Sequence, residues 1–536
     1  MRHAVVLACA LAWAGCGGDA RRPSGGVPDG GGTPGGTDPG PGIPPEVDGG
    51  TPAPPPTTLK APLSVDGWTF YGAEQGLPVE VYDVSADEGG NVYVAGGDGV
   101  YAKRPAATVA PADDVFARFD AASAGITKNC YQGLDPWDKS NKAALDLFTH
   151  PAPPGPAVMC PVISVAGAAP GKVIIGFEGY GTDGDYEADW ATDSSGLDVL
   201  QLDPAALKMS RTRHVLVASP PGVVCGTFEG QGSARGCVPG EYFMTNGRRK
   251  LRNVSRIVVN HDKAARQYGD VWMAGTHVAL SAFFNDQAEA RGWGGNAAIA
   301  DCPNVPFVDV KACPKFAESR NVWEHEHPAF NSTTYANNPG VLIGPGLTGE
   351  TYALALAPSG QPWSHNGLRL ATMNGDTADV SNPFMPWDRV FDLWPDGPTA
   401  PDMDNVQAMT FCPDGALWVG SFSHGLARVN TTNGGVSGQS LPGGGQNVWA
   451  LACDRNGVLW ISTDWAEIVR LDTRTGVATM PLAARAGLPD VANRVAWNIQ
   501  IDEWSGPEPI VYFAMHSRTD TQGVLQPGGV VAYSGK

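Results

Sequence analysis

In one stretch of the chain, the same pattern of hydrophobic and polar positions occurs twice in succession. Between residues 404 and 472, a short apolar run leads into an Asx-Gly turn, then a second strand with a Trp, a polar bend and a third strand. Asx-Gly between apolar runs supplies the positive φ that a tight hairpin turn needs. Trp418 and Trp460 occupy matched positions 42 residues apart. Strand repeats of this length predict propeller blades, because a single blade cannot bury its own faces.

Weaker copies of the same pattern occur along the rest of the chain. Their second strands are centred on Tyr93, Ile174, Trp272, Trp363 and Tyr512. The last copy ends after three strands, whereas the segment Trp68 to Tyr71 reads as a spare strand. We therefore predict an all-β fold over residues 60–536. It is a seven-bladed β-propeller whose ring is closed by the N-terminal strand in the last blade, which removes exposed sheet edges. Six or eight blades are the alternatives.

Composition agrees with a turn-rich repeat protein and restricts the partners. The chain has 69 Gly and 46 Pro among 536 residues, and its formal net charge is −19. Nucleic acid is excluded as a partner, because phosphate binding needs a cationic surface. Acidity of this kind keeps an exported protein soluble, and we expect a monomer.

The N-terminus predicts export and a lipid anchor. Residues 1–16 combine a basic head with an apolar run that is too short to span a bilayer, as in a signal peptide. Their end, L-A-W-A-G-C, resembles a bacterial lipobox, although Trp13 stands where an aliphatic residue is usual. The resemblance implies lipidation of Cys16 and, because Asp does not follow it, anchoring to the outer membrane or cell surface. Cleavage by an ordinary signal peptidase at Ala14 is the alternative.

Residues 17–59 consist almost entirely of Gly, Pro, Asp, Thr and Ala. Such a segment has nothing to bury, so we predict a disordered tether between the anchor and the propeller. A tail without function is the alternative.

Eight cysteines remain after the signal peptide, and an even number in an exported chain predicts disulfides. Proximity in sequence suggests the pairs Cys130–Cys160, Cys225–Cys237, Cys302–Cys313 and Cys412–Cys453, although eight cysteines allow 105 connectivities. The first three pairs fall in long insertions between blades. From Tyr93 to Trp363 the marker residues are separated by 81, 98 and 91 positions, against 42 for a bare blade. We expect stapled insertions on one face, where repeat proteins build binding sites; loops without function are the alternative.

Most blades also place an ionisable residue at the bend that follows the marker. The set is Asp98, Glu178, His277, His365, His424, Asp464 and His516. These side chains would surround the mouth of the central channel. They could bind a divalent metal, supply an acid–base pair or hydrogen-bond a sugar, although polar bends are also common at any surface.

The insertions hold two further candidate metal sites. His325 and His327 would project from the same side of an extended segment, as two metal ligands must. Asp183 and Asp185 open an acidic stretch that suits the oxygen-rich shell of calcium, with a solvated acidic loop as the alternative. A divalent metal, calcium or magnesium, is therefore the candidate cofactor. No nucleophile elbow, P-loop or dinucleotide motif occurs in its required context, so no catalytic residue is assigned.

Three short motifs point to a known family. Gly76-Leu-Pro78, the Asx-Gly-x-Leu-Trp of both opening repeats and Gly425-Leu-x-Arg428 are similar to two-component-regulator propeller repeats. Such repeats form the periplasmic sensor of hybrid histidine kinases and also occur in free-standing secreted proteins. The clear match covers residues 67–101 and 404–490. No signalling domain is recognisable, so the resemblance implies the propeller alone.

The leading hypothesis is a surface-tethered lipoprotein whose propeller binds a glycan, a peptide or an envelope partner. The first alternative is an enzyme resembling streptogramin lyases, which share the fold and use histidine and glutamate with magnesium. A scaffold in an envelope complex is the second alternative.

Overall fold

The computed structural model describes residues 59–136, 152–180, 194–215, 253–265, 268–275, 278–284, 323–324, 353–366, 369–373, 387–394, 406–421, 424–442, 447–463, 468–480, 487–489, 495–515, 517–519 and 525–535. This part of the chain is all-β, as predicted. Its helices are three short 3₁₀ turns, η1 (Ala73–Gln75), η2 (Ala106–Thr108) and η3 (Pro111–Asp113). None of the helices described is long and apolar enough to cross a membrane.

Most strands form antiparallel sheets in sequence order. The first three sheets consist of β3 (Asp83–Ala86), β4 (Val92–Ala95), β5 (Val100–Lys103) and β6 (Ala117–Phe119); β9 (Val162–Gly167), β10 (Lys172–Phe177), β11 (Leu197–Asp203) and β12 (Lys208–Val215); and β13 (Val254–Val259), β14 (Asp270–Gly275), β15 (Val278–Phe284) and β16 (Trp323–Glu324). The next three consist of β17 (Ala355–Leu356), β18 (Pro362–Asn366), β19 (Arg369–Met373) and β20 (Trp387–Asp392); β21 (Val406–Phe411), β22 (Leu417–Ser421), β23 (Gly425–Val429) and β24 (Val436–Gln439); and β25 (Val448–Cys453), β26 (Val458–Thr463), β27 (Ile468–Asp472) and β28 (Val477–Thr479).

A seventh sheet joins the two ends of the described chain. It contains β29 (Ala496–Asp502), β30 (Ile510–Met515), β33 (Gly529–Tyr533), β2 (Trp68–Tyr71) and β1 (Leu63–Val65). β2 pairs antiparallel with β33, with Trp68 opposite Tyr533. β1 then pairs with β2 as a fifth strand, which the sequence pattern did not predict because its three residues are mostly exposed.

Two small hairpins lie outside these seven sheets, β7 (Lys128–Tyr131) with β8 (Ala157–Met159) and β31 (Arg518–Thr519) with β32 (Leu525–Gln526).

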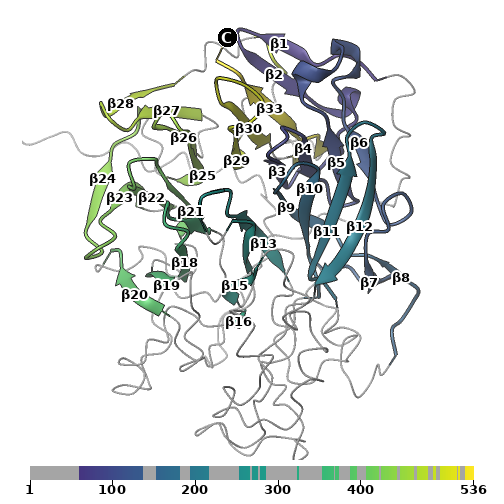
Figure 1. Cartoon of the computed structure of the whole chain (residues 1–536), viewed down its shortest axis with the longest axis horizontal. Helices are drawn as coiled ribbons and strands as arrows, with labels where there is room; N and C mark the ends of the chain where they lie inside the picture. The colour runs from purple at the N-terminus through teal and green to yellow at the C-terminus, as the bar shows by residue number, and fades with distance from the viewer. Residues whose placement is uncertain are drawn as a thin grey trace, which may run out of the picture.

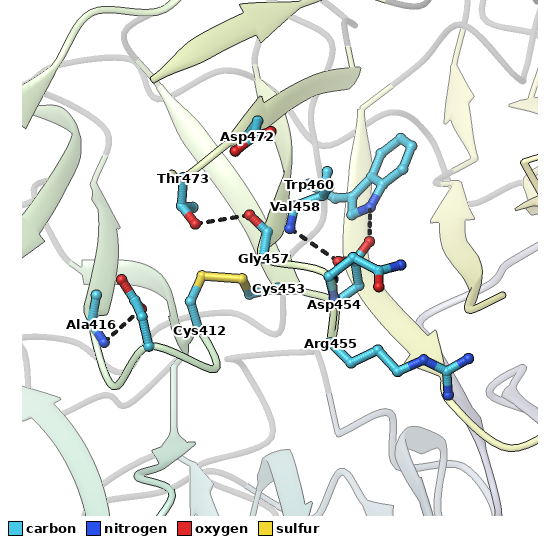
Figure 2. Close-up of a disulfide and its surroundings, with 12 residues drawn as sticks. Cys412, Ala416, Cys453, Asp454, Arg455, Gly457, Val458, Trp460, Asp472 and Thr473 are labelled. Carbon is cyan, nitrogen blue, oxygen red and sulfur yellow. Dashed lines mark hydrogen bonds between the residues drawn. A yellow bond between two sulfur atoms is a disulfide. The ribbon is translucent and has the colours of Figure 1, made fainter. Parts of the chain in front are cut away.

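The hairpin between the first and second strands of a sheet is built as the sequence predicts. Gly457 has a φ of 77°, which its lack of a Cβ permits. The preceding Asp454 accepts hydrogen bonds from the backbone N–H groups of Asn456 and Val458, at 2.9 and 3.0 Å. Its second oxygen lies 3.4 Å from Trp460 Nε1 (Figure 2). The turn, its acidic cap and the marker Trp are thus one local unit, which explains why they recur together in the sequence.

The first strands of the sheets face the centre of the molecule (Figure 1). β9 packs against β3 and β13, β21 packs against β17 and β25, and β29 packs against β25 and β3. Large aromatic residues fill the space between neighbouring sheets. Trp460 is 2% exposed and packs beside Trp68, Phe513 and Tyr533 of the sheet that holds both chain ends. Burying each such side chain contributes roughly 1.5–3 kcal/mol. The marker Trp residues are therefore packing residues.

Two of the expected disulfides are present. Cys130–Cys160 bridges the segment that carries the β7–β8 hairpin between the first two sheets. Cys412–Cys453 joins the end of β21 to the end of β25 in neighbouring sheets (Figure 2). The cysteines of the other two expected pairs, Cys225, Cys237, Cys302 and Cys313, lie outside the described residues.

Candidate functional site

A cavity of about 370 Å³ lies at the centre of the molecule, between the first strands of the sheets. Every one of the seven sheets contributes its first strand to the lining. The lining includes Ser85, Val165, Ile257, Ala355, Met409, Leu451 and Ile499. The wall is thus largely aliphatic, with a few polar groups, as is usual for small-molecule sites. We call this space the central channel. Its hairpin end is where the first strands finish, and its bend end is where they begin.

The hairpin end holds a buried carboxylate with three donors. The side chain of Glu88 is 1% exposed. It lies 3.1 Å from His261 Nδ1, 2.9 Å from Lys263 Nζ and 2.9 Å from Tyr268 OH. Burial raises the pKa of Glu88, but the hydrogen bonds from these three donors outweigh it and hold the pKa at about 2. Glu88 is therefore an anion that ties the hairpin after β3 to the hairpin after β13.

A third sheet reaches the same point. The ring of Trp504, from the hairpin after β29, lies 4.7 Å from that of His261, measured between centroids. Both residues line the channel. Beside them, Arg455 Nε lies 3.2 Å from Glu503 Oε2, and Arg455 also donates to the Glu503 backbone carbonyl at 2.8 Å. Side chains from hairpins far apart in sequence thus meet across the hairpin end of the channel.

A second polar group lies near the start of the first strands. Asp83 is buried, and burial raises the pKa of its carboxyl. It accepts hydrogen bonds from the N–H groups of Val84 and Val165, both at 2.9 Å, and from Asn498 Nδ2. The guanidinium of Arg256, which lines the channel, lies 4.0 Å from the same carboxylate. Glu88, Glu503 and Asp83 therefore each face a cation.

The bend end carries aromatic side chains at bulges in the strand pairing. The pairing of β25 shifts register between Val448 and Ala450, and that of β29 shifts between Ala496 and Asn498. The residues at these bulges are Trp449 and Trp497, whose rings lie 5.5 Å apart at 73°. Both are only partly buried, unlike the marker Trp residues. Bulges re-aim side chains near functional sites, and here they bring two Trp rings together, each next in sequence to a residue that lines the channel, Ala450 or Asn498.

Four of the predicted bend residues are described, and the structure does not bring them together at the channel. Asp98 is exposed and ion-paired with Arg118 at 3.0 Å. Glu178 and His365 are buried in the sheets, and His365 Nε2 accepts the Ala353 N–H at 3.1 Å. The ring of His424 stacks on Trp394, with centroids 4.5 Å apart and planes at 20°. None of these four side chains lines the channel.

The other predicted site residues lie outside the described residues. They are His277, Asp464, His516, His325, His327, Asp183, Asp185 and Cys16. Within the described ranges, no group of three or more His, Cys, Asp or Glu side chains could hold a metal ion. The predicted metal sites and the lyase-like enzyme, which needs His516, stay predictions.

The sequence pattern did not predict the residues that meet at the hairpin end of the channel. Glu88, His261 and Glu503 each directly follow the Asp or Asn that ends a first strand, namely Asp87, Asn260 and Asp502. In isolation they look like ordinary polar turn residues. The position directly after the capping Asx in each repeat is the signal that could have found them.

Comparisons with known proteins support the repeat family. A family model described as two component regulator propeller matches residues 442–465, which contain β25 and β26. A search of the curated proteins finds none that matches this chain.

Several solved structures are similar in fold. The extracellular domain of a hybrid two-component system from B. thetaiotaomicron is 14% identical with a TM-score of 0.43; the match covers 88% of this chain and 42% of that one. Virginiamycin B lyase from Staphylococcus aureus is 10% identical with a TM-score of 0.39, covering 85% and 95% of the two chains. Sqt1 from Saccharomyces cerevisiae is 11% identical with a TM-score of 0.40, covering 89% and 99%.

At these identities and TM-scores, nothing about ligand or reaction is carried over from the three structures. This chain spans less than half the length of the hybrid two-component domain that it matches. The resemblance predicted from the sequence motifs is nevertheless confirmed, because residues 442–465 match the family model for the two-component-regulator propeller repeat.

Proposed function

We propose that the seven sheets are the blades of a closed seven-bladed β-propeller that binds a ligand in its central channel. The observation that carries the proposal is that one strand from each of the seven sheets lines a single cavity. Pairing of β2 with β33 supports closure of the ring by the N-terminal strand in the last blade.

The contacts at the two ends of the channel suggest the direction of entry. At the hairpin end, Glu88, His261 and Trp504 from three sheets meet and reduce access. The bend end carries Trp449 and Trp497, together with the stacked pair of Trp394 and His424. A ligand therefore enters at the bend end, past aromatic rings.

The charge balance of the wall favours a neutral ligand. Glu88 faces Lys263 at 2.9 Å, Glu503 faces Arg455 at 3.2 Å, and Asp83 faces Arg256 at 4.0 Å. A charged ligand would gain little from such paired groups and would lose its hydration. A neutral glycan fits better, because the apolar faces of sugar rings stack on Trp and their hydroxyls hydrogen-bond amide and imidazole groups. A peptide or an envelope protein is the other outcome of the test below.

The binding test uses the mature protein and three neutral tetrasaccharides, one each of β-1,4-glucose, β-1,4-N-acetylglucosamine and α-1,4-glucose. We expect titration calorimetry to detect one of them binding to the channel. Trp449→Ala or Trp497→Ala should weaken that binding by roughly tenfold, because each removes a stacking face. Val477→Ala on the exposed edge strand β28 is the control and should leave binding unchanged. Binding of none of the three tetrasaccharides, as expected if the ligand is a peptide or an envelope protein, would contradict the proposal, and so would equal binding by all variants.

The proposal also includes export and anchoring. Cys16 carries the lipid, residues 17–59 form the tether, and the propeller faces outward from the outer membrane or remains in the periplasm. Cys16→Ser should move the protein from the membrane fraction to the soluble fraction. A variant that stays with the membrane would count against the anchor while leaving the channel proposal intact.

A further inference from the structure

The hairpin end of the channel contains an imidazole held in one orientation. His261 follows Asn260, whose side chain accepts the Asp262 N–H at 2.9 Å and so fixes the turn. The ring then has two contacts, Glu88 at its Nδ1 and the face of Trp504. Trp504 is fixed in turn, because its backbone N–H donates to Asp502 at 2.8 Å. The ring of His261 is thus positioned before any ligand arrives, which lowers the entropic cost of using it.

The contact with Glu88 determines which ring nitrogen of His261 is the acceptor. Glu88 is an anion with a pKa of about 2, so its carboxylate accepts a hydrogen bond from His261 Nδ1. When the imidazole is neutral, Nδ1 carries the hydrogen and Nε2 is left with a lone pair. Among the described residues, none forms a hydrogen bond with Nε2 of His261. His261 lines the channel, so this lone pair belongs to a side chain that a ligand in the channel would contact.

The surroundings restrict what that acceptor would bind. Glu88 and Glu503 are both occupied by cations, so they do not attract a second positive charge. No third His, Cys, Asp or Glu lies near enough among the described residues to complete a metal site. A neutral O–H or N–H donor remains. Trp504 beside the imidazole offers a flat apolar face to whatever carries that donor.

We propose that His261 and Trp504 form a binding subsite at the hairpin end of the channel. In this inner subsite, His261 Nε2 accepts a hydrogen bond from a hydroxyl of a neutral ligand that lies against Trp504. The inference rests on the proposed function, since it places the inner end of the same ligand. It adds a second recognition point to the Trp pair at the bend end. A first strand of six residues separates the two points, so they lie about 20 Å apart and only an extended ligand reaches both.

The test is titration calorimetry with the tetrasaccharide that binds the wild-type protein most tightly. His261→Phe keeps a flat ring beside Trp504 but removes the acceptor, and we expect it to weaken binding by about tenfold. His261→Gln places an amide oxygen near the position of Nε2, and it should bind within about threefold of the wild type.

The chain offers a matched control for loss of an imidazole–carboxylate pair. His214 Nδ1 on β12 lies 2.7 Å from the buried Asp198, and neither residue lines the channel. His214→Gln should therefore leave tetrasaccharide binding unchanged. A general effect of removing such a pair on folding would instead weaken binding in both variants.

A second readout does not depend on a substitution. In protein labelled with ¹⁵N-histidine, the ring nitrogens of His261 should show the Nδ1–H tautomer, and the Nε2 signal should shift when the tetrasaccharide binds. If His261→Phe binds as tightly as wild type and the Nε2 signal stays unchanged, the inner subsite is contradicted, although weaker binding by Trp449→Ala would still support ligand binding in the channel. If the wild-type protein binds no tetrasaccharide, both the proposed function and the inner subsite are contradicted.

Discussion

The two ends of the central channel are built from the same strands but in different ways. At the hairpin end, charged side chains from different sheets pair with each other, and Cys412–Cys453 joins two neighbouring sheets. At the bend end, Asp83 contacts Val165 and Asn498 of neighbouring sheets, and Trp449 contacts Trp497 at two strand bulges. Both ends are thus held by contacts between sheets, but the hairpin end uses ion pairs and a disulfide, whereas the bend end carries partly buried Trp rings next to residues that line the channel.

The largest expected effect on stability concerns the disulfide at the hairpin end. The Cys412–Cys453 disulfide closes a loop with a sequence separation of 41. Loop-closure entropy of that size stabilises the folded state by about 4 kcal/mol, because the cross-link restricts the unfolded chain. Replacing both cysteines with Ala should lower the free energy of unfolding by that amount in denaturant titrations.

The comparison predicts an additional, local effect for the second disulfide. Cys130–Cys160 staples an insertion beside the β7–β8 hairpin rather than two first strands. The same loop-closure argument gives this disulfide, with a separation of 30, nearly the same effect on global unfolding, about 3.7 kcal/mol. Its removal should in addition loosen the β7–β8 hairpin, seen as faster amide exchange there. If amide exchange at that hairpin stays unchanged, this disulfide has no local role.

The next effect concerns the buried carboxylate. The pKa of Glu88 is about 2 in the folded protein, below its ordinary value of 4.5. A lowered pKa contributes stability that is present above about pH 4.5 and is lost as the pH falls through about 2, because between these pH values the unfolded state binds a proton at this carboxyl and the folded state does not. Glu88→Gln should cost roughly 3 kcal/mol at neutral pH and flatten the decline of stability between pH 4.5 and 2.

An exposed pair provides the control for that pH profile. Glu74 forms an ion pair with Lys60, and both side chains are more than half exposed. Glu74→Gln should leave the acid unfolding profile close to that of the wild type, since exposed pairs contribute little. Urea unfolding measured at several pH values distinguishes the two variants. Equal profiles would mean that Glu88 does not stabilise the hairpin end.

The sequence predicted the features that repeat locally and missed those that depend on ring geometry. The hairpin turn, the Asx cap and the marker Trp lie within a few residues of each other, as Asp454, Gly457 and Trp460 do, so their pattern is visible in a single copy. The contact between Glu88, His261 and Trp504 joins three hairpins separated by hundreds of residues. No local pattern reports such a contact, and the bulges at Trp449 and Trp497 likewise depend on pairing with the next strand.

Some bend residues are ionisable for reasons that have nothing to do with the channel. His365 accepts a backbone N–H within its own sheet, and Asp98 pairs with Arg118 at the surface. A polar residue in a bend satisfies local donors first, and only strand direction and burial decide whether it reaches the centre. The ring expected around the channel mouth was therefore a prediction about position that residue type alone could not support.

Replacement of Asp98 has the smallest predicted effect on stability. It also tests whether the ligand contacts the bend of the first sheet. The Asp98 carboxylate lies 3.0 Å from Arg118 Nε and accepts the Tyr101 hydroxyl at 2.9 Å, but its side chain and that of Arg118 are each about half exposed. Water screens such a pair and the side chains lose entropy in forming it, so Asp98→Asn should change the free energy of unfolding by less than about 0.5 kcal/mol. Tetrasaccharide binding should be unchanged as well, because Asp98 does not line the channel. A loss of binding in Asp98→Asn, measured beside Trp449→Ala, would place the ligand over the bends of the first sheet and move the site away from the two Trp rings.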